Sequence, residues 1–406
     1  MVSTKGRNVT HRLHKRQGFA AVLVASALVL VACGDDNKAS SDTTADTTAD
    51  TTADTTADTT ADTTATADPL ADLYQECLDN GAKVNLIALP DEWANYKGVL
   101  DSFATKYPGV DHPVQNPNGS SQEELDAVVN LAGQDDMPDA IDVSPAKAII
   151  AADTGLWLGY EPTTIDEVPD NMKDPGGNWV SAYYGVMSIG TNTTIVPNAP
   201  TSFADLAKPE YQGQVALNGD PRTSGSALAA VMAASIANGG SADDIMPGIQ
   251  FFADLKASGN LIPTEVTQAT VISGETPIAL DWSYNYPGLA AAVADAGFTV
   301  QINFPTDAAY GAPYAQGVVA GSPHTACGQL WIEHILSNEG ALAYLQGGGM
   351  PARYAAVDAA GLISEADKAN LPPADLLADV VFLTPAQSTA ANDALLANWG
   401  PMVSGD

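Results

Sequence analysis

The chain is short of basic residues. It carries 16 Lys and Arg against 49 Asp and Glu, which gives a formal net charge of −33 over 406 residues. Only ten of the basic residues follow residue 68, so the globular part is acidic because bases are missing there. A surface of this charge repels phosphate backbones and anionic headgroups. Binding to nucleic acid or to a lipid surface by charge is therefore disfavoured.

Cysteine and the common cofactor motifs are also scarce. The only cysteines are Cys33, Cys77 and Cys327, and there is no C-x-x-C pair. The three histidines after residue 68 are far apart in the sequence, so a zinc site is not predicted. The sequence has no P-loop, no dinucleotide-binding fingerprint and no G-x-S-x-G motif. No cofactor is therefore predicted.

The apolar run at 19–31 is too short for a membrane-spanning helix, which needs about 20 apolar residues. It follows five basic residues and ends at the sequence Leu-Val-Ala-Cys-Gly, in which the cysteine is Cys33. This pattern is typical of a bacterial lipoprotein signal, in which the cysteine thiol is acylated after cleavage. It predicts a signal peptide at 1–32 and a lipid anchor at Cys33, on the outer face of the cell membrane. The alternative is an ordinary secretory signal.

The segment at 33–68 is predicted to be a disordered tether. Six repeats of Asp-Thr-Thr-Ala fill 42–65. They offer no apolar side chain larger than alanine and a negative charge at every fourth position, so they cannot form a packed core. In an extracytoplasmic protein the remaining two cysteines, Cys77 and Cys327, are expected to form a disulfide, with two free buried thiols as the alternative.

The rest of the chain shows the alternation of strands and helices that is typical of α/β proteins. In its first part, strands are predicted at 84–89, 110–114 and 139–143, and helices at 93–106, 121–131 and 145–154. Further strands are predicted at 215–217, 277–280 and 316–320. An Ala-rich helix should end at Ala237, and other helices are expected near 249–255, 289–296, 329–336 and 339–345. The rhythm in the first part favours a parallel sheet.

The length after residue 68 exceeds what one hydrophobic core usually supports, so two lobes are expected. We predict a first part of lobe 1 at 69–189, lobe 2 at 190–304, and a return to lobe 1 with C-terminal helices at 305–406. Two open α/β lobes joined by two crossings would form a ligand cleft at the carboxyl ends of their strands.

The blocks Thr-Ser-Phe-Ala-Asp-Leu-Ala-Lys-Pro-Glu-Tyr-Gln-Gly at 201–213 and Asp-Pro-Arg-Thr-Ser-Gly-Ser at 220–226 make the chain resemble a known family. In their order and spacing they are similar to the extracytoplasmic solute-binding proteins of ABC importers, in the group with ferric-, thiamine-, phosphonate- and polyamine-binding members. The resemblance covers roughly 83–353. It implies a type II periplasmic-binding-protein fold, closure of the cleft on a small solute, and an ABC permease as partner.

Two segments of lobe 2 are the main candidates for ligand contact. Arg222, Thr223, Ser224 and Ser226 lie between a strand end and a helix start, where free N–H groups and hydroxyls suit an anion. The alternative is that a hydroxyl only caps the helix. The other candidates are Asp281, Trp282 and Tyr284, which follow a strand and combine aromatic walls with polar groups, and Trp93 and Ser144, which follow strands of lobe 1. The alternative for the aromatic residues is core packing.

These residues favour an anionic organic solute, with a polyamine and ferric ion as the alternatives. The hydroxyl-rich helix start favours an anionic organic solute such as a phosphonate, a sugar phosphate or a carboxylate. Asp281 and the acidic surface favour a cation such as a polyamine, and the adjacent pair Tyr183 and Tyr184 leaves ferric ion open. Two other classes are weaker alternatives: a serine acyl-transfer enzyme, since Ser144-Pro145-Ala146-Lys147 matches S-x-x-K, and a surface adhesin on a stalk. We expect a binding protein rather than an enzyme.

Overall fold

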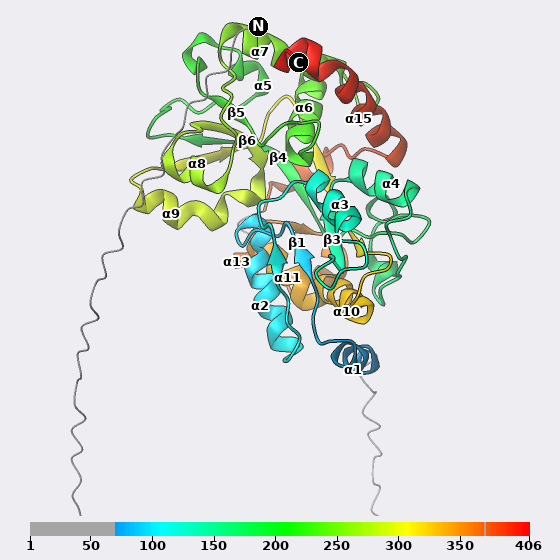
Figure 1. Cartoon of the computed structure of the whole chain (residues 1–406). Helices are drawn as coiled ribbons and strands as arrows, with labels where there is room; N and C mark the ends of the chain where they lie inside the picture. The colour runs from blue at the N-terminus through cyan, green and yellow to red at the C-terminus, as the bar shows by residue number, and fades with distance from the viewer. Residues whose placement is uncertain (1–69, 369–370) are drawn as a thin grey trace, which may run out of the picture. The chain divides into compact units, whose positions relative to one another are not determined.

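The computed structural model describes residues 70–406 except 369–370 (Figure 1). The predicted signal peptide, the predicted lipid anchor Cys33 and the predicted tether lie outside the described residues. Within the described part of the chain, every helix is too short or too polar to cross a membrane.

Lobe 1 contains two small sheets. β1 (Leu86–Ile87) runs parallel to β2 (Val114–Gln115), and β3 (Ala140–Val143) pairs antiparallel with β9 (Ala315–Val318). The helices of this lobe are α1 (Ala71–Asp79), α2 (Tyr96–Lys106), α3 (Ser121–Asn130), α4 (Pro145–Asp153), α10 (Thr325–Ile335), α11 (Asn338–Gln346), α12 (Tyr354–Ala359) and α13 (Glu365–Lys368). The strands are shorter than predicted, and α1 has no counterpart among the predicted elements.

Local sequence signals explain where helices of lobe 1 begin. Ser120 caps α3: its Oγ accepts from the backbone N–H of Glu123, while Glu123 accepts from the backbone N–H of Ser120. This reciprocal pair satisfies two N–H groups that the helix itself leaves free. Pro145 opens α4, where its missing N–H is no loss. Both starts are where the sequence predicts them.

Lobe 2 is built on the sheet formed by β4 (Tyr183–Asn192), β6 (Ile278–Trp282) and β5 (Val215–Leu217), with β7 (Val300–Asn303) beside β4. β5 and β6 are parallel, whereas β6 and β7 run antiparallel to β4. The helices are α5 (Phe203–Leu206), α6 (Gly225–Ala237), α7 (Met246–Ser258), α8 (Gln268–Ser273) and α9 (Ala290–Asp295). The alanines of α6 are almost all buried, because small side chains let α6 pack closely against its neighbours.

The long strand β4 is one of the two crossings between the lobes. Its first residues pair with β8 (Gly311–Pro313) and β10 (Met350–Pro351), and its later residues pair with β6 and β7 of lobe 2. The chain returns from β7 through β8 to β9 in lobe 1. Because β9 comes back from the other lobe, it meets β3 antiparallel. The predicted parallel pairing in lobe 1 is confirmed for β1 and β2, but it does not hold for β3, which pairs antiparallel with β9. The two-lobed type II architecture is confirmed.

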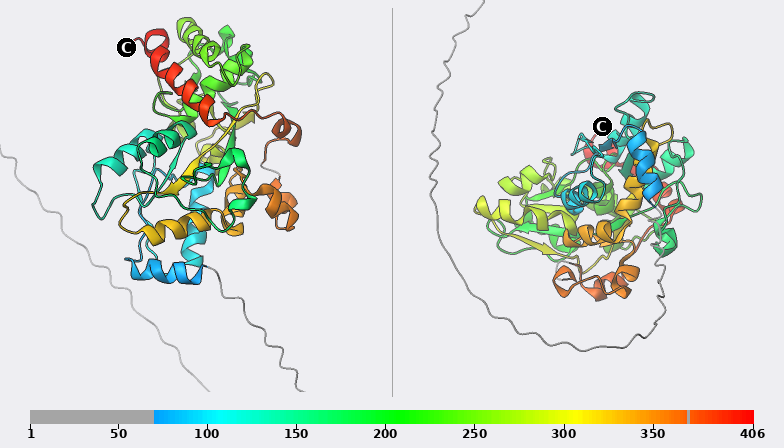
Figure 2. Two further views of the ribbon diagram at one scale, coloured as in Figure 1. Left: turned by 90° about the vertical axis from the view of Figure 1, so that its right-hand side faces the viewer. Right: turned by 90° about the horizontal axis from the view of Figure 1, so that it is seen from below.

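The C-terminal helix α15 (Pro385–Trp399) follows α14 (Ala374–Ala378) and touches both lobes. It contacts α4 of lobe 1 and α6 and α7 of lobe 2, and the final turn Gly400–Ser404 packs on α7. Figures 1 and 2 show α15 in red beside the green helices of lobe 2, at the end remote from α1. The end of the chain thus packs on lobe 2, a placement that the predicted return segment at 305–406 did not specify.

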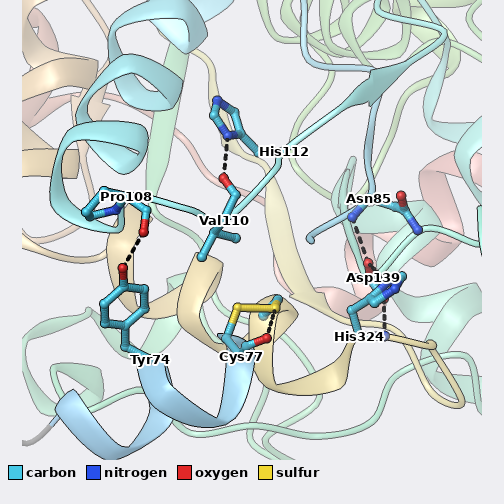
Figure 3. The surroundings of a disulfide bond; sticks show 9 residues. Tyr74, Cys77, Asn85, Pro108, Val110, His112, Asp139 and His324 are labelled. Carbon is cyan, nitrogen blue, oxygen red and sulfur yellow. Dashed lines mark hydrogen bonds and ion pairs between the residues drawn. A yellow bond between two sulfur atoms is a disulfide. The ribbon is translucent and has the colours of Figure 1, made fainter. Parts of the chain in front are cut away.

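A disulfide joins Cys77 of α1 to Cys327 of α10, as the cysteine count predicted (Figure 3). The two residues are 250 positions apart, and both are fully buried. Beside them, the buried carboxylate of Asp139 accepts from the backbone N–H of Asn85 and of His324. The first helix of lobe 1 is therefore tied to the helix that follows the return crossing.

Candidate ligand-binding site

A pocket of about 360 Å³ lies between the lobes, a size suited to a small ligand. It is lined by loops that follow strands and by the first turns of α3 and α6. From lobe 1 it is lined by Ala88, Pro90, Glu92, Trp93, Asn118, Gly119, Ser120, Ser121, Glu123, Glu124 and Asp142. From lobe 2 it is lined by Asn218, Gly219, Asp220, Thr223, Ser224, Gly225, Ser226, Glu265, Val266, Thr267, Gln268, Val271, Asp281, Asn285, Tyr286 and Leu289, and Tyr314 comes from the return segment.

The charged residues that line the pocket are all acidic. Seven acidic residues line it: Glu92, Glu123, Glu124, Asp142, Asp220, Glu265 and Asp281. Of the residues that the structure describes, no Lys, Arg or His belongs to the lining. Asp220 alone has a basic partner, because Arg222 reaches it from outside the pocket at 2.6 Å. Every ionisable carboxyl or base in the described lining is therefore an acid.

Asp281 supplies a buried carboxylate from lobe 2. It is only 3% exposed, and it lies near the end of β6. Its Oδ1 accepts from the backbone N–H of Trp282 at 2.8 Å, and its Oδ2 accepts from the side-chain amides of Asn218 and Asn285, each at 2.9 Å. Burial raises the pKa of Asp281 to about 6, although the three donors favour the ionised form.

Asp142 is the corresponding carboxylate of lobe 1, on β3. Its Oδ2 accepts from the hydroxyls of Tyr96 at 2.6 Å and Tyr183 at 2.9 Å, and its Oδ1 accepts from the Gln316 side-chain amide at 2.7 Å. Burial raises its pKa to about 7, and the hydrogen bonds act in the opposite direction. Asp142 therefore changes its protonation near neutral pH.

Glu124 of α3 lies next to Asp142. Its Oε2 accepts from the backbone N–H of Asp142 at 2.9 Å, and the residue is 2% exposed. Its Oε1 has no hydrogen-bond partner within the described chain. Burial, and then the nearby charge of Asp142, raise the pKa of Glu124 well above its ordinary value. Lobe 1 thus presents two adjacent carboxyl groups that need either protons or a cation.

Aromatic rings form part of the wall. Trp93 lies 5.4 Å from the ring of Tyr284 and 5.5 Å from the ring of Tyr314, both in edge-to-face geometry. Its indole N–H donates to the Tyr183 hydroxyl at 2.8 Å, and that hydroxyl donates to Asp142. Trp93 and Tyr314 line the pocket, so aromatic side chains and carboxyl groups both form part of its wall.

The hydroxyls at the start of α6 line the pocket but already have partners. Ser224 is the N-cap of α6: its Oγ accepts from the backbone N–H of Ala227 and donates to the backbone oxygen of Asn218. Thr223 donates to the backbone oxygen of Asp220 at 3.2 Å, and Ser226 lies 3.3 Å from the Tyr314 hydroxyl. The capping role that the sequence left open for this segment is present.

The structure brings together five of the nine predicted contact residues: Trp93, Thr223, Ser224, Ser226 and Asp281 line the pocket. The other four do not. The guanidinium of Arg222 is held by Asp220 and Asp406, Trp282 and Tyr284 are buried in the core, and Ser144 packs at the start of α4. The alternative of core packing is the one that describes these two aromatic residues.

Sequence reasoning missed the acidic character of the lobe 1 wall. A signal was available, because Asp142 interrupts the apolar strand Ala-Ile-Asp-Val, where a buried acid is unusual. Glu124 shares a helix face with Val128, which is buried. Neither signal says that the two carboxyl groups meet. Among the described residues, no group of three or more His, Cys, Asp and Glu side chains is placed to hold a metal ion.

Comparison with known proteins agrees with the fold. The family model described as bacterial extracellular solute-binding protein matches residues 136–378. Periplasmic binding protein AfuA from Actinobacillus pleuropneumoniae, with bound fructose-6-phosphate, is similar at a TM-score of 0.64 and 17% identity, over 79% of this chain and 99% of that chain. Iron-bound HitA from Pseudomonas aeruginosa is similar at a TM-score of 0.60 and 22% identity, over 78% and 98%.

A third similar structure is the spermidine/putrescine substrate-binding protein PotD from Streptococcus pneumoniae, at a TM-score of 0.55 and 16% identity, over 79% of this chain and 99% of that chain. At these identities the similarities show the type II fold alone. No curated protein matches the sequence significantly.

Proposed function

Because the chain belongs to the family of bacterial extracellular solute-binding proteins, we propose that it is the receptor of an ABC importer and that its solute is a small organic cation. The observation that carries the choice of solute is the lining of the pocket: seven acidic residues and, within the described chain, no base. The receptor would close its lobes on the solute and deliver it to a permease.

The charges favour a cation over the anionic solute that the sequence predicts. A unit charge about 4 Å from a carboxylate interacts by about 4 kcal/mol at an effective dielectric constant of about 20. For an anion this term is repulsive at each nearby carboxylate, and Arg222, which bonds the lining residue Asp220, is also engaged by Asp406. A cation gains from each of these carboxylates.

Size and composition of the pocket favour an organic cation over a bare ion. Aromatic side chains such as Trp93 and the apolar side chains of Val266, Val271 and Leu289 contribute to the lining. The ferric alternative is less well supported, since the Tyr183 hydroxyl is bonded to Asp142 and Tyr184 packs against Phe382. Neither tyrosine lines the pocket.

The acyl-transfer alternative has little support from the geometry. In the S-x-x-K segment, the Lys147 amine donates to the Gln122 side-chain oxygen at 2.8 Å, and Ser144 does not line the pocket. The adhesin alternative does not account for a pocket built from both lobes.

Closure can be described in terms of the two walls. A cation that contacts Asp281 on lobe 2 and Asp142 on lobe 1 favours the closed state, because only there does it meet both carboxylates. The lobes already meet closely at one point: a Cβ on Gly225 would lie 2.6 Å from Cβ of Ser144. This approach of α6 to lobe 1 requires a glycine.

The proposal is tested by a thermal-shift and calorimetry screen of the purified protein with spermidine, putrescine, fructose-6-phosphate and ferric citrate. A bound ligand stabilises the protein by RT ln(1 + [L]/Kd). We expect the organic cations to raise the melting temperature and the sugar phosphate to have no effect. Stabilisation by the sugar phosphate or by ferric ion alone would overturn the choice of a cation.

Cation affinity is expected to fall as the pH drops through the range from about 7 to about 6. Asp142 and Asp281 have pKa values raised to about 7 and about 6, so they bind protons in that range, and a proton competes with a cation. Binding at neutral pH should therefore release protons, which calorimetry in buffers of different ionisation enthalpy measures. An affinity that is constant from about pH 5 to about pH 8 would contradict this prediction.

We further propose that Cys33 anchors the protein by acylation. Cys33→Ala is expected to abolish lipid labelling and to leave the protein unanchored or unprocessed, because the thiol is the acylated group. The measurement is incorporation of a labelled fatty acid, with detergent partitioning, in cells that express either form. Cys77→Ala serves as the control and should keep the label. Equal labelling of the Cys33→Ala protein would rule out the anchor.

A further inference from the structure

We infer that the solute carries two cationic hydrogen-bond donors, one bound by Asp281 of lobe 2 and the other by Glu124 and Asp142 of lobe 1. This inference rests on the proposed function and narrows it, from organic cations in general to compounds with a positive group at each of two ends. It follows from counting which oxygen lone pairs of the buried carboxylates are still free.

On the lobe 2 side, Asp281 has room for one more donor. Each carboxylate oxygen accepts about two hydrogen bonds. The side-chain amides of Asn218 and Asn285 fill Oδ2, and the backbone N–H of Trp282 takes one position on Oδ1. The position left on Oδ1 can take a donor, and Asp281 lines the pocket. The two amides also fix the orientation of the carboxylate.

On the lobe 1 side, two carboxyl groups each have a position free to accept another hydrogen bond. The Tyr96 and Tyr183 hydroxyls fill Oδ2 of Asp142, and the Gln316 amide takes one position on Oδ1. Oε1 of Glu124 has no hydrogen-bond partner within the described chain. The residue is only 2% exposed, and it lines the pocket. Because Glu124 lines the pocket, a donor group of the solute can reach this free oxygen.

A solute with a single positive group would leave one wall unsatisfied. When the lobes close, carboxylates on both walls lose water, and a buried charge without a partner is strongly unfavourable. An ammonium or guanidinium group at each end supplies donors to both walls at once. Apolar lining residues such as Trp93, Val266 and Leu289 suit an alkyl linker joining the two groups.

The experiment compares putrescine with n-butylamine, which has the same carbon chain but one amine, and with 4-aminobutyrate, in which a carboxylate replaces the second amine. Dissociation constants are measured by calorimetry at about pH 8, where the carboxylates with pKa values of about 6 and about 7 are ionised. We expect putrescine to bind about 10- to 100-fold more tightly than n-butylamine, as for loss of a charge-assisted hydrogen bond, and 4-aminobutyrate to bind least.

Variants test each wall separately. In Asp281→Asn and in Glu124→Gln the ratio of the two affinities should fall toward one, because the second amine has lost its partner. Glu275→Gln, an exposed residue outside the pocket, changes the net charge equally and should keep the ratio. A general loss of structure would weaken both amines alike and leave the ratio unchanged.

The outcomes separate the inference from the function on which it rests. If n-butylamine binds as tightly as putrescine, the solute is a cation but the two-ended inference is wrong. If neither amine binds, or only 4-aminobutyrate does, both the inference and the proposed cation receptor are wrong. A ratio that stays unchanged in both wall variants, while each variant still unfolds cooperatively and still binds n-butylamine, also overturns the assignment of the two walls.

Discussion

Asp281→Asn is expected to weaken binding of an organic cation about 10- to 100-fold and at the same time to stabilise the unliganded protein. The loss of affinity follows from removing a charge-assisted hydrogen bond, worth about 1.5–3 kcal/mol. The carboxylate is buried, lines the pocket and has one free acceptor position, so its replacement acts directly on the ligand.

The gain in stability follows from the pKa of Asp281. Burial raises it from 3.8 to about 6, so ionised Asp281 destabilises the folded state by about 3 kcal/mol at pH values above about 6. Below about pH 4 Asp281 is protonated in both the folded and the unfolded state, so the folded state has its full stability. That stability is lost as the pH rises through about 6. Asparagine is never ionised, and when the side-chain amide of Asn285 turns over, its unpartnered Oδ1 accepts from the new amide. An increase of about 1–3 kcal/mol is expected at about pH 8.

Ser224→Ala is the matched comparison and should show the opposite pattern. Ser224 caps α6, so its loss should lower the free energy of unfolding by about 1 kcal/mol while cation affinity changes little. Chemical denaturation and calorimetry on both variants measure the two quantities. If Ser224→Ala loses affinity and Asp281→Asn keeps it, the solute is an anion held at the start of α6.

Removing the disulfide is expected to lower the free energy of unfolding by about 4–5 kcal/mol. The bond closes a loop of 250 residues, and the chain-entropy estimate rises slowly with loop length. The double variant Cys77→Ala/Cys327→Ala tests this by denaturant unfolding. Cation affinity should be unchanged, because neither cysteine lines the pocket.

The control for this prediction is reduction of the unaltered protein under the same conditions. Reductant should lower the stability of the unaltered protein toward that of the double variant and should not affect the double variant. If the two proteins unfold at the same denaturant concentration, the bond contributes nothing to stability and the prediction is wrong.

Local signals predicted the elements well. The capping pair Ser120 and Glu123, the proline that opens α4 and the short apolar strands all act within a few residues, so they can be read from the sequence. The length of the chain predicted two lobes, and the family resemblance added the type II architecture. The antiparallel direction of β9 against β3 could not be predicted from the sequence. It depends on a crossing that brings together residues about 175 positions apart.

The binding site was predictable only in part for the same reason. Strand ends and helix starts pointed to Asp281 and to the segment Thr223 to Ser226, which do line the pocket. The wall formed by Glu124 and Asp142 depends on the packing of α3 against β3, and no local pattern reports it. Arg222 was a candidate for ligand contact, but its guanidinium forms ion pairs with Asp220 and Asp406 instead.

The acidic lining of the pocket also affects the rate at which the receptor binds its solute. A negative field around the mouth draws cations toward it and raises the rate constant of association, and dissolved salt screens that field within about 10 Å at 0.1 M. The rate constant of dissociation is set instead by contacts inside the closed cleft, where salt has little access. Ionic strength would thus govern how often the receptor captures a solute, and hardly at all how long it keeps it.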